Sequence, residues 1–348
     1  MSLRSAALVV CALVALGSSG CAGSEPPSEV VLVTHDSFAV SKDVLGAFEE
    51  ESGLTVRVLQ GGDTGAMTNT ALLTAGDPQG DVIFGIDDNL VSRVVTGELL
   101  DDYVSGELEA VDPAFPSRAG QLTPIDHGEV CLNADRSAFG GNGLPPLPVT
   151  LDDLTDPQYK GMLVVENPAT SSPGLAFLLA TVARFGEKGY LEYWRRLVTN
   201  DVLVVDGWEE AYTQQFSGAG GSPGRRPLVV SYATSPAAEV IFAGKQLEES
   251  PTVAIEDGCF RQVEYAGVLR GAANPEGART LIDFMLSARF QADVPGSMFV
   301  YPVRTGVALP VAFTRHAIAP RAPLSLPPDE IAAGRDRWVA AWTDVALR

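Results

Sequence analysis

Hydroxyl side chains gather where a predicted strand ends and a predicted helix begins. Apolar residues 228–230 lead into Ser231-Tyr-Ala-Thr-Ser235, and Pro236 then begins a predicted helix that runs to Phe242. A strand that ends in hydroxyls at a helix N-terminus offers side-chain donors and free backbone N–H groups, which suit an anion or a polar ligand. Ser and Thr before Pro also suit plain helix capping. The stretch therefore predicts either a ligand site or an N-cap.

A second strand end of the same kind lies upstream. Met162-Leu-Val-Val165 runs into Glu166-Asn-Pro-Ala-Thr-Ser-Ser-Pro-Gly174, which precedes an apolar helix predicted over 175–185. In open α/β sheets, ligands bind outside the carboxyl ends of the strands. We therefore expect both strand ends to be able to converge on one small molecule.

The elements that must position these loops alternate between strands and helices. Strands are predicted at 30–33, 54–59 and 81–85, with helices between them, and after Pro124 the rhythm restarts with strands at 162–165, 201–205 and 228–232. This order predicts βαβ units with mainly parallel sheets, arranged as two successive α/β units.

The C-terminal segment divides into two parts. The proline-rich stretch 309–328 is predicted to lack regular structure, and residues 331–347 form an amphipathic helix. Trp338 and Trp342 lie four residues apart on this helix, a spacing that favours packing in the core over contact with a ligand.

The N-terminus has the pattern of an export signal. Residues 1–20 contain a single charge, Arg4, then an apolar run and small residues before Cys21, which predicts a signal peptide followed by lipid attachment at Cys21. Residues 21–29 read as a flexible tether. The alternative is plain secretion with Cys21 incidental. We expect anchoring to the outer face of the cell membrane, periplasmic in a Gram-negative source, through the lipid alone.

The composition limits the classes of partner that the chain can bind. The chain has 44 acidic and 24 basic residues and a net charge of −20, which argues against nucleic acid and is compatible with a cationic ligand. Besides Cys21, the exported chain retains only Cys131 and Cys259. Outside the cytoplasm, two such cysteines most simply form one disulfide.

Six segments, taken in order, resemble the thiamine-binding proteins of bacterial ABC importers. They are Thr34-His-Asp-Ser-Phe38, Asp81-Val-Ile-Phe-Gly-Ile-Asp-Asp-Asn-Leu90, Asn167-Pro-Ala-Thr-Ser-Ser-Pro-Gly-Leu175, Asp206-Gly-Trp-Glu-Glu-Ala-Tyr212, Ser231-Tyr-Ala-Thr-Ser-Pro236 and Tyr301-Pro-Val303. The resemblance implies a two-lobed class II periplasmic binding protein fold, with lobe 1 over 30–125, lobe 2 over 126–262, and a return to lobe 1 with a C-terminal helix over 263–348. It further implies a monomer that passes thiamine or a relative to a permease, without a cofactor and without catalysis.

The resemblance also implies the ligand contacts. The family's contact positions fall on Thr64, Gly65, Ser171, Ser172, Trp208, Tyr232, Ala233, Thr234 and Ser235. Asp36 or Asp63 would balance a cationic thiazolium, and Trp208 and Tyr232 would offer it aromatic faces. The chain has His35 and Ala238 where the family has Tyr, and Phe299 where it has Trp. These departures imply weaker thiamine binding or a different heterocycle, or a thiamine phosphate in place of thiamine.

Two other classes stay open. Thiaminase I enzymes share the fold and use a cysteine nucleophile, and Cys131 follows Asp126-His-Gly-Glu129, which offers acidic groups. A binding protein for a metal, with His35 and Asp36 as ligands, or for another small solute is the second alternative.

Overall fold

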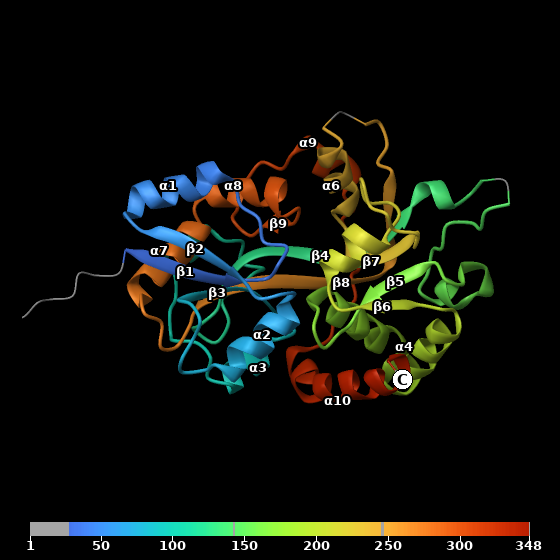
Figure 1. Cartoon of the computed structure of the whole chain (residues 1–348), viewed down its shortest axis with the longest axis horizontal. Helices are drawn as coiled ribbons and strands as arrows, with labels where there is room; N and C mark the ends of the chain where they lie inside the picture. The colour runs from blue at the N-terminus through green and yellow to red at the C-terminus, as the bar shows by residue number, and fades with distance from the viewer. Residues whose placement is uncertain (1–27, 142, 245–246, 348) are drawn as a thin grey trace, which may run out of the picture.

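The computed structural model describes residues 28–141, 143–244 and 247–347 (Figure 1). The predicted signal peptide, Cys21 and tether residues 21–27 lie outside the described residues. Within the described part of the chain, no helix has the length and apolar character needed to cross a membrane.

The strands form one continuous sheet in the order β2-β1-β3-β8-β4-β7-β5-β6, and β9 pairs with β4. Their bounds are β1 (Glu29–Thr34), β2 (Thr55–Gln60), β3 (Val82–Asp87), β4 (Thr123–Asp135), β5 (Leu163–Glu166), β6 (Leu203–Val205), β7 (Leu228–Tyr232), β8 (Thr252–Val268) and β9 (Tyr301–Pro302).

Two long strands join the two halves of the sheet. In the first lobe β1 runs parallel to β2 and β3, and in the second β5 runs parallel to β6 and β7. Between them, β4 and β8 pair with each other and run antiparallel to their outer neighbours (Figure 1). The sheet is therefore parallel within each lobe, as predicted, but mixed as a whole. The lobe boundaries expected at 125/126 and 262/263 fall inside these two strands.

Helices cover both faces of this sheet. The α-helices are α1 (Lys42–Ser52), α2 (Thr64–Leu73), α3 (Val91–Thr96), α4 (Ser172–Thr199), α5 (Trp208–Glu210), α6 (Ser235–Phe242), α7 (Pro275–Met285), α8 (Ala288–Ser297), α9 (Val311–His316) and α10 (Pro328–Ala346). Shorter helical turns are η1 (Gly106–Ala110), η2 (Arg136–Ala138), η3 (Asp152–Thr155), η4 (Pro157–Tyr159) and the π-helix η5 (Ala211–Gln215).

Helix α9 lies inside the stretch 309–328, which was predicted to lack regular structure, so that prediction is wrong for Val311–His316. This run contains no proline, and Pro310 stands before it at the N-cap, where a missing N–H costs nothing.

The C-terminal helix packs against the second lobe. Trp342 of α10 meets Trp194 of α4 edge to face, with ring centroids 5.4 Å apart, and Trp338 Nε1 donates to a Glu187 carboxylate oxygen at 3.2 Å. Trp338 and Trp342 are both buried, which confirms their prediction as core residues.

A disulfide joins the two crossing strands. Cys131 of β4 and Cys259 of β8 are bonded, the pairing expected from the sequence, and both are buried. The bond closes a loop with a sequence separation of 128, for which the chain-entropy model gives about 4–5 kcal/mol of stabilisation. A disulfide sulfur carries no thiolate, so Cys131 is not a nucleophile in this state.

Candidate functional site

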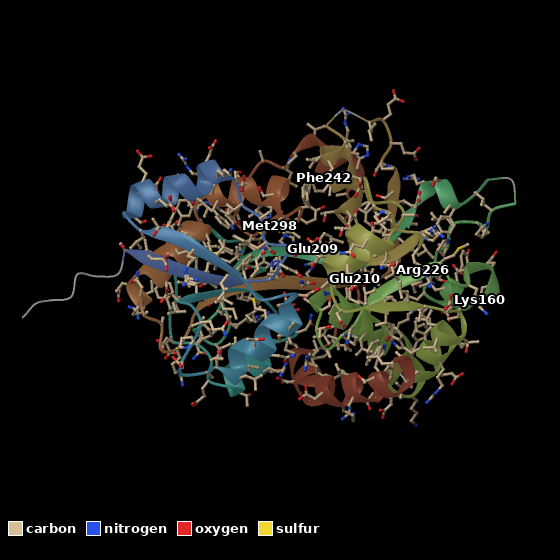
Figure 2. All side chains as sticks on the ribbon, in the orientation of Figure 1. Lys160, Glu209, Glu210, Arg226, Phe242 and Met298 are labelled. Atoms are coloured by element: carbon tan, nitrogen blue, oxygen red, sulfur yellow. A yellow bond between two sulfur atoms is a disulfide. The ribbon has the colours of Figure 1, made fainter. Side chains whose placement is uncertain are left out.

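A cavity of about 780 Å³ lies between the lobes, where α2, α4, α5 and α6 begin. It also takes residues from the loop after β1, from β8 and from 296–300. Figure 2 labels Glu209, Phe242 and Met298, which line it from three different segments. The predicted site residues that line the cavity are Asp63, Thr64, Ser172, Trp208, Tyr232, Thr234, Ser235 and Phe299.

Four predicted contact residues do not line the cavity. Ser171 instead caps α4, since its hydroxyl accepts from Gly174 N at 3.3 Å. Ala233 is buried in a small cluster with the two disulfide cysteines. Asp36 is only half buried, and its backbone N–H donates to Gly62 O at 3.1 Å.

The fourth of these residues, Gly65, packs against the other lobe. A Cβ added there would lie 2.6 Å from the carbonyl carbon of Thr170 and 2.7 Å from its oxygen. Gly65 does not line the cavity because it lies against the backbone of Thr170, and its missing side chain lets the two backbones come close.

Trp208 forms an aromatic wall of the cavity. It begins α5, which passes directly into the π-helix η5, and its ring stacks on Tyr212 with centroids 5.0 Å apart and 17° between the planes. Tyr232 meets Trp208 edge to face at 6.3 Å. Tyr212 also lines the cavity but was missed as a site residue. Its spacing of four residues from Trp208 was the signal available in the sequence.

Hydroxyls at the end of β7 and the start of α6 hold this wall in place. Trp208 Nε1 donates to Ser231 Oγ at 2.9 Å, and Ser231 Oγ lies 2.8 Å from Ser235 Oγ, which also accepts from Tyr232 N at 3.1 Å. Thr234 occupies the N-cap of α6 without a side-chain capping bond, and its buried Oγ1 has no partner among the described residues. The sequence predicted either a ligand site or a helix cap for this stretch, and in the structure its hydroxyl side chains do not cap α6.

Asp63 fastens three segments together. Its Oδ1 accepts from Thr64 N at 2.6 Å and from Ser172 N at 3.0 Å, and its Oδ2 accepts from Trp208 N at 2.9 Å. The first bond caps α2 in lobe 1, and the other two reach α4 and α5 in lobe 2. Because the carboxylate is buried, the pKa of Asp63 is raised, although the hydrogen bonds from Trp208 N and Ser172 N oppose the rise.

Further carboxyl groups line the cavity: Glu209, Glu239 and Glu264. Glu239 is held by Tyr212 Oη, which donates at 2.8 Å, and by Gly220 N at 2.9 Å. Glu264 of β8 stands opposite Asp126 of β4 in the strand register, and burial raises the pKa of both carboxyls. Sequence reasoning missed these three glutamates, although a charge inside the apolar run of β8 was a usable signal.

His35, one of the departures from the family pattern, is a neutral wall of the cavity. Burial lowers the pKa of its imidazole to about 4, and Nδ1 lies 2.9 Å from Ser37 Oγ. Gly85 makes room for the ring: its φ is +102°, and a Cβ there would lie 2.4 Å from His35 Cδ2.

The two other departures, Ala238 and Phe299, line the cavity. Phe299 contacts Phe242 with ring centroids 4.7 Å apart. Phe242 lies one helical turn after Ala238 on α6, so this chain supplies a ring near the position where the family's tyrosine is missing. Phe242 was not predicted as a site residue.

The part of the chain that the structure describes holds no cluster of three or more His, Cys, Asp or Glu side chains that could bind a metal ion. His35 and Asp36, the metal ligands considered from the sequence, are therefore not joined there by a third ligand of these types.

Comparison with known proteins identifies relatives over nearly the whole chain. A thiamine-binding periplasmic protein of Salmonella typhimurium is 30% identical over 324 residues, covering 92% of this chain and 94% of that protein, and the protein of that name from Escherichia coli K12 is 28% identical over equal shares. The solved structure of a periplasmic thiamin binding protein superposes with a TM-score of 0.81 at 26% identity, covering 94% and 98% of the two chains.

Iron-bound HitA from Pseudomonas aeruginosa, at 20% identity and a TM-score of 0.72 over 92% of this chain and all of HitA, shares the fold. The family model for bacterial extracellular solute-binding proteins matches residues 77–331. With the two-lobed sheet and the cavity between its halves, these matches establish that the chain belongs to the bacterial extracellular solute-binding proteins.

Proposed function

We propose that this protein captures thiamine outside the cytoplasm and delivers it to an ABC permease. The observation that carries the proposal is the cavity itself, in which the aromatic faces of Trp208 and Tyr232 stand beside acidic side chains. Thiamine combines a cationic thiazolium with an aminopyrimidine. An aromatic face attracts such a cation by about 0.5–2 kcal/mol, and carboxylates supply its counter-charge.

Binding would proceed by closure of the lobes, without a covalent step. In the conformation described here, α2 docks on the loop before α4, where Ala66 N donates to Thr170 O at 2.9 Å. Ser172 Oγ donates to Asp87 Oδ2 across the same junction. These contacts would form as the lobes close on the ligand, in the manner of hinged binding proteins.

The location of the protein is part of the proposal. Residues 1–20 would direct export, Cys21 would carry the lipid that holds the protein at the membrane, and the binding unit would act as a monomer. The boundaries 30–125, 126–262 and 263–348 serve as working lobe limits, with β4 and β8 as the connecting strands.

Titration calorimetry with thiamine tests the ligand directly, and a native mass spectrum of the purified protein tests for a ligand that co-purifies. Trp208 provides an independent optical signal, because Trp194, Trp338 and Trp342 are buried away from the cavity. We expect thiamine to quench fluorescence in the wild type, and Trp208→Phe to abolish most of that change. Absence of heat with thiamine, together with heat from another metabolite, would refute the ligand and leave the family unaffected.

A further inference from the structure

A second cavity, of about 480 Å³, has no lining residue in common with the cavity between the lobes. Its walls come from the loop between β3 and α3, from a turn at Arg118, from the middle of β8 and from the segment that leads into α10 (Figure 1). Protein cavities that hold small molecules enclose about 300–1,000 Å³. The second cavity is therefore large enough for a ligand of its own.

Arg118 brings an unpaired positive charge to this second cavity. Its Nε donates to Tyr265 Oη at 3.2 Å, which orients the guanidinium, but it forms no ion pair with the other residues that the structure describes. In a chain with 44 acidic and 24 basic residues, an arginine without a carboxylate partner is unexpected. A guanidinium presents its N–H donors as a planar fork, which matches the two oxygens of a carboxylate.

A second arginine in the lining, Arg261, already has a partner. Glu129 stands opposite it in the register of β4 and β8, and Glu129 Oε1 lies 3.0 Å from Arg261 Nε and 2.9 Å from Nη2. The acidic residue in the lining is Asp88, and burial together with the nearby Asp87 raises its pKa to about 7. Asp88 therefore carries less than a full negative charge near neutral pH, and the charge of Arg118 is in excess.

Asn89 contributes an amide that has no partner. Its side chain lines the second cavity and is only 1% exposed, and neither its nitrogen nor its oxygen forms a hydrogen bond with the other described residues. Its backbone N–H donates to Asp87 Oδ1 at 2.7 Å, which fixes the position of the residue. A buried polar group without a partner costs free energy, so such groups are rare in folded proteins. A ligand in the adjoining cavity would supply the missing partner.

The rest of the lining is mostly apolar, with Val91, Phe260, Leu326 and Ile331 as its larger side chains. The segment before α10 is fixed against β8, since Leu324 N donates to Cys259 O at 2.7 Å. Small-molecule sites commonly combine such an apolar wall with a few polar groups that orient the ligand. The wall favours a ligand with an apolar body over a bare inorganic anion.

We propose that the second cavity binds a small organic carboxylate. Arg118 holds the carboxylate group, the amide of Asn89 is a further donor, and the apolar body of the ligand lies against the wall that Phe260 and Leu326 help to form. The inference goes beyond the proposed function, because this site shares no residue with the cavity between the lobes. It stands or falls without regard to the ligand of that cavity.

The probe for this site is 4-fluorobenzoate, observed by fluorine NMR during titration with the purified protein, and 4-fluorobenzamide is its uncharged match. Hydrogen bonds to a charged group are about twice as strong as neutral ones, so we expect the benzoate to bind at least about tenfold more tightly than the amide. Equal binding of the two, or no binding of the benzoate at up to about 10 mM, overturns the inference. Inorganic phosphate should compete less well than unlabelled benzoate, and equal competition would contradict the role of the apolar wall.

Variants locate the probe. Arg118→Gln should weaken binding of 4-fluorobenzoate at least about fivefold, and Arg118→Lys, which keeps the charge without the planar fork, should weaken it less. Arg289→Gln makes the same charge change at an exposed position of α8 and should leave the affinity unchanged.

A second variant tests the apolar wall without changing a charge. Leu326→Ala, at a half-buried position, should weaken binding of 4-fluorobenzoate about threefold by removing apolar contact. Thermal unfolding of each variant shows whether the fold is retained, and Leu326→Ala keeps the test available if Arg118→Gln does not fold. Wild-type affinity for the probe in folded Arg118→Gln, or in folded Leu326→Ala, overturns the inference.

Discussion

Gly65 allows closure to be separated from folding. In Gly65→Ala the new Cβ would lie 2.6 Å from the Thr170 carbonyl carbon, about 0.8 Å closer than an ordinary van der Waals contact. Because Thr170 meets it with backbone atoms, no side-chain movement can relieve the overlap. The two segments belong to different lobes, so the overlap is relieved as the lobes part. The variant should therefore disfavour the closed conformation and leave each lobe intact.

The size of the effect follows from two opposed terms. Overpacking of this kind costs about 1–3 kcal/mol, and it acts on the closed form. Gly65 lies inside α2 with helical backbone, where Ala is favoured over Gly by about 0.5–1 kcal/mol in open and closed forms alike. The free energy gained in the helix is the same in the open and closed forms, so it does not affect the binding equilibrium. The dissociation constant should therefore rise about 5- to 150-fold. The unfolding temperature of the ligand-free protein should stay the same or rise.

Calorimetry and thermal unfolding on the same samples measure the two effects. Gly46→Ala is the matched control: it makes the same substitution in the interior of α1, at a position where an added Cβ meets nothing within 4 Å. We expect it to raise stability slightly and leave affinity unchanged. Wild-type affinity in Gly65→Ala would refute the role assigned to this glycine. A fall in unfolding temperature with affinity preserved would show that the contact supports the fold.

Three further measurements test other parts of the structure. Replacing Cys131 and Cys259 together by Ala should lower the free energy of unfolding in urea by up to about 4–5 kcal/mol, and an unchanged urea midpoint would contradict this. Burial raises the pKa of Asp87 to about 6 and of Asp88 to about 7, and it also raises the pKa of Asp126 and Glu264, so the folded chain binds protons at these carboxyls that the unfolded chain has lost. The pKa of His35 and of His127 is lowered to about 4, which opposes part of this gain, but the carboxyls outnumber the histidines. The ligand-free protein should therefore gain stability as pH falls from about 7 towards 4, and a melting temperature that drops between pH 7 and 5.5 would speak against it. Phe242 is 65% exposed, so Phe242→Ala should change the free energy of unfolding by less than about 0.5 kcal/mol. The variant should nevertheless weaken binding up to about tenfold, because it removes a ring that contacts Phe299 at the cavity. Equal affinities of wild type and variant would show that this ring contact does not contribute to binding.

The sequence predicted the order of strands and helices because each lobe is built from local βαβ units. The strand end at 228–232 pointed to Tyr232 and the hydroxyls beside it, and the family resemblance pointed to Trp208; the structure places Trp208 and Tyr232 along one cavity, and their role in binding stays a prediction. What it could not predict depends on long-range register. The pairing of Asp126 with Glu264 follows from the alignment of two crossing strands, and no local pattern encodes that alignment.

The same limit applies to Gly65 and Asp63. The resemblance implied Gly65 as a ligand contact and Asp63 as a counter-charge for the ligand. Their structural partners, Thr170 and Trp208, are distant in the chain and lie in the opposite lobe. Contacts across a lobe junction are set by tertiary packing, so a single sequence offers no spacing from which to predict them.

The carboxyl groups at the lobe junction connect binding to closure. Asp63, Asp87 and Glu264 are buried there, and burying a carboxylate is costly unless its charge is balanced. Asp63 and Asp87 accept hydrogen bonds across the junction from Ser172, so closing the lobes removes both from water. On the proposed function, the ligand cation supplies the missing positive charge at this moment. The empty closed form then carries an electrostatic cost that the occupied form does not, and a permease that recognises the closed form would receive mainly loaded protein.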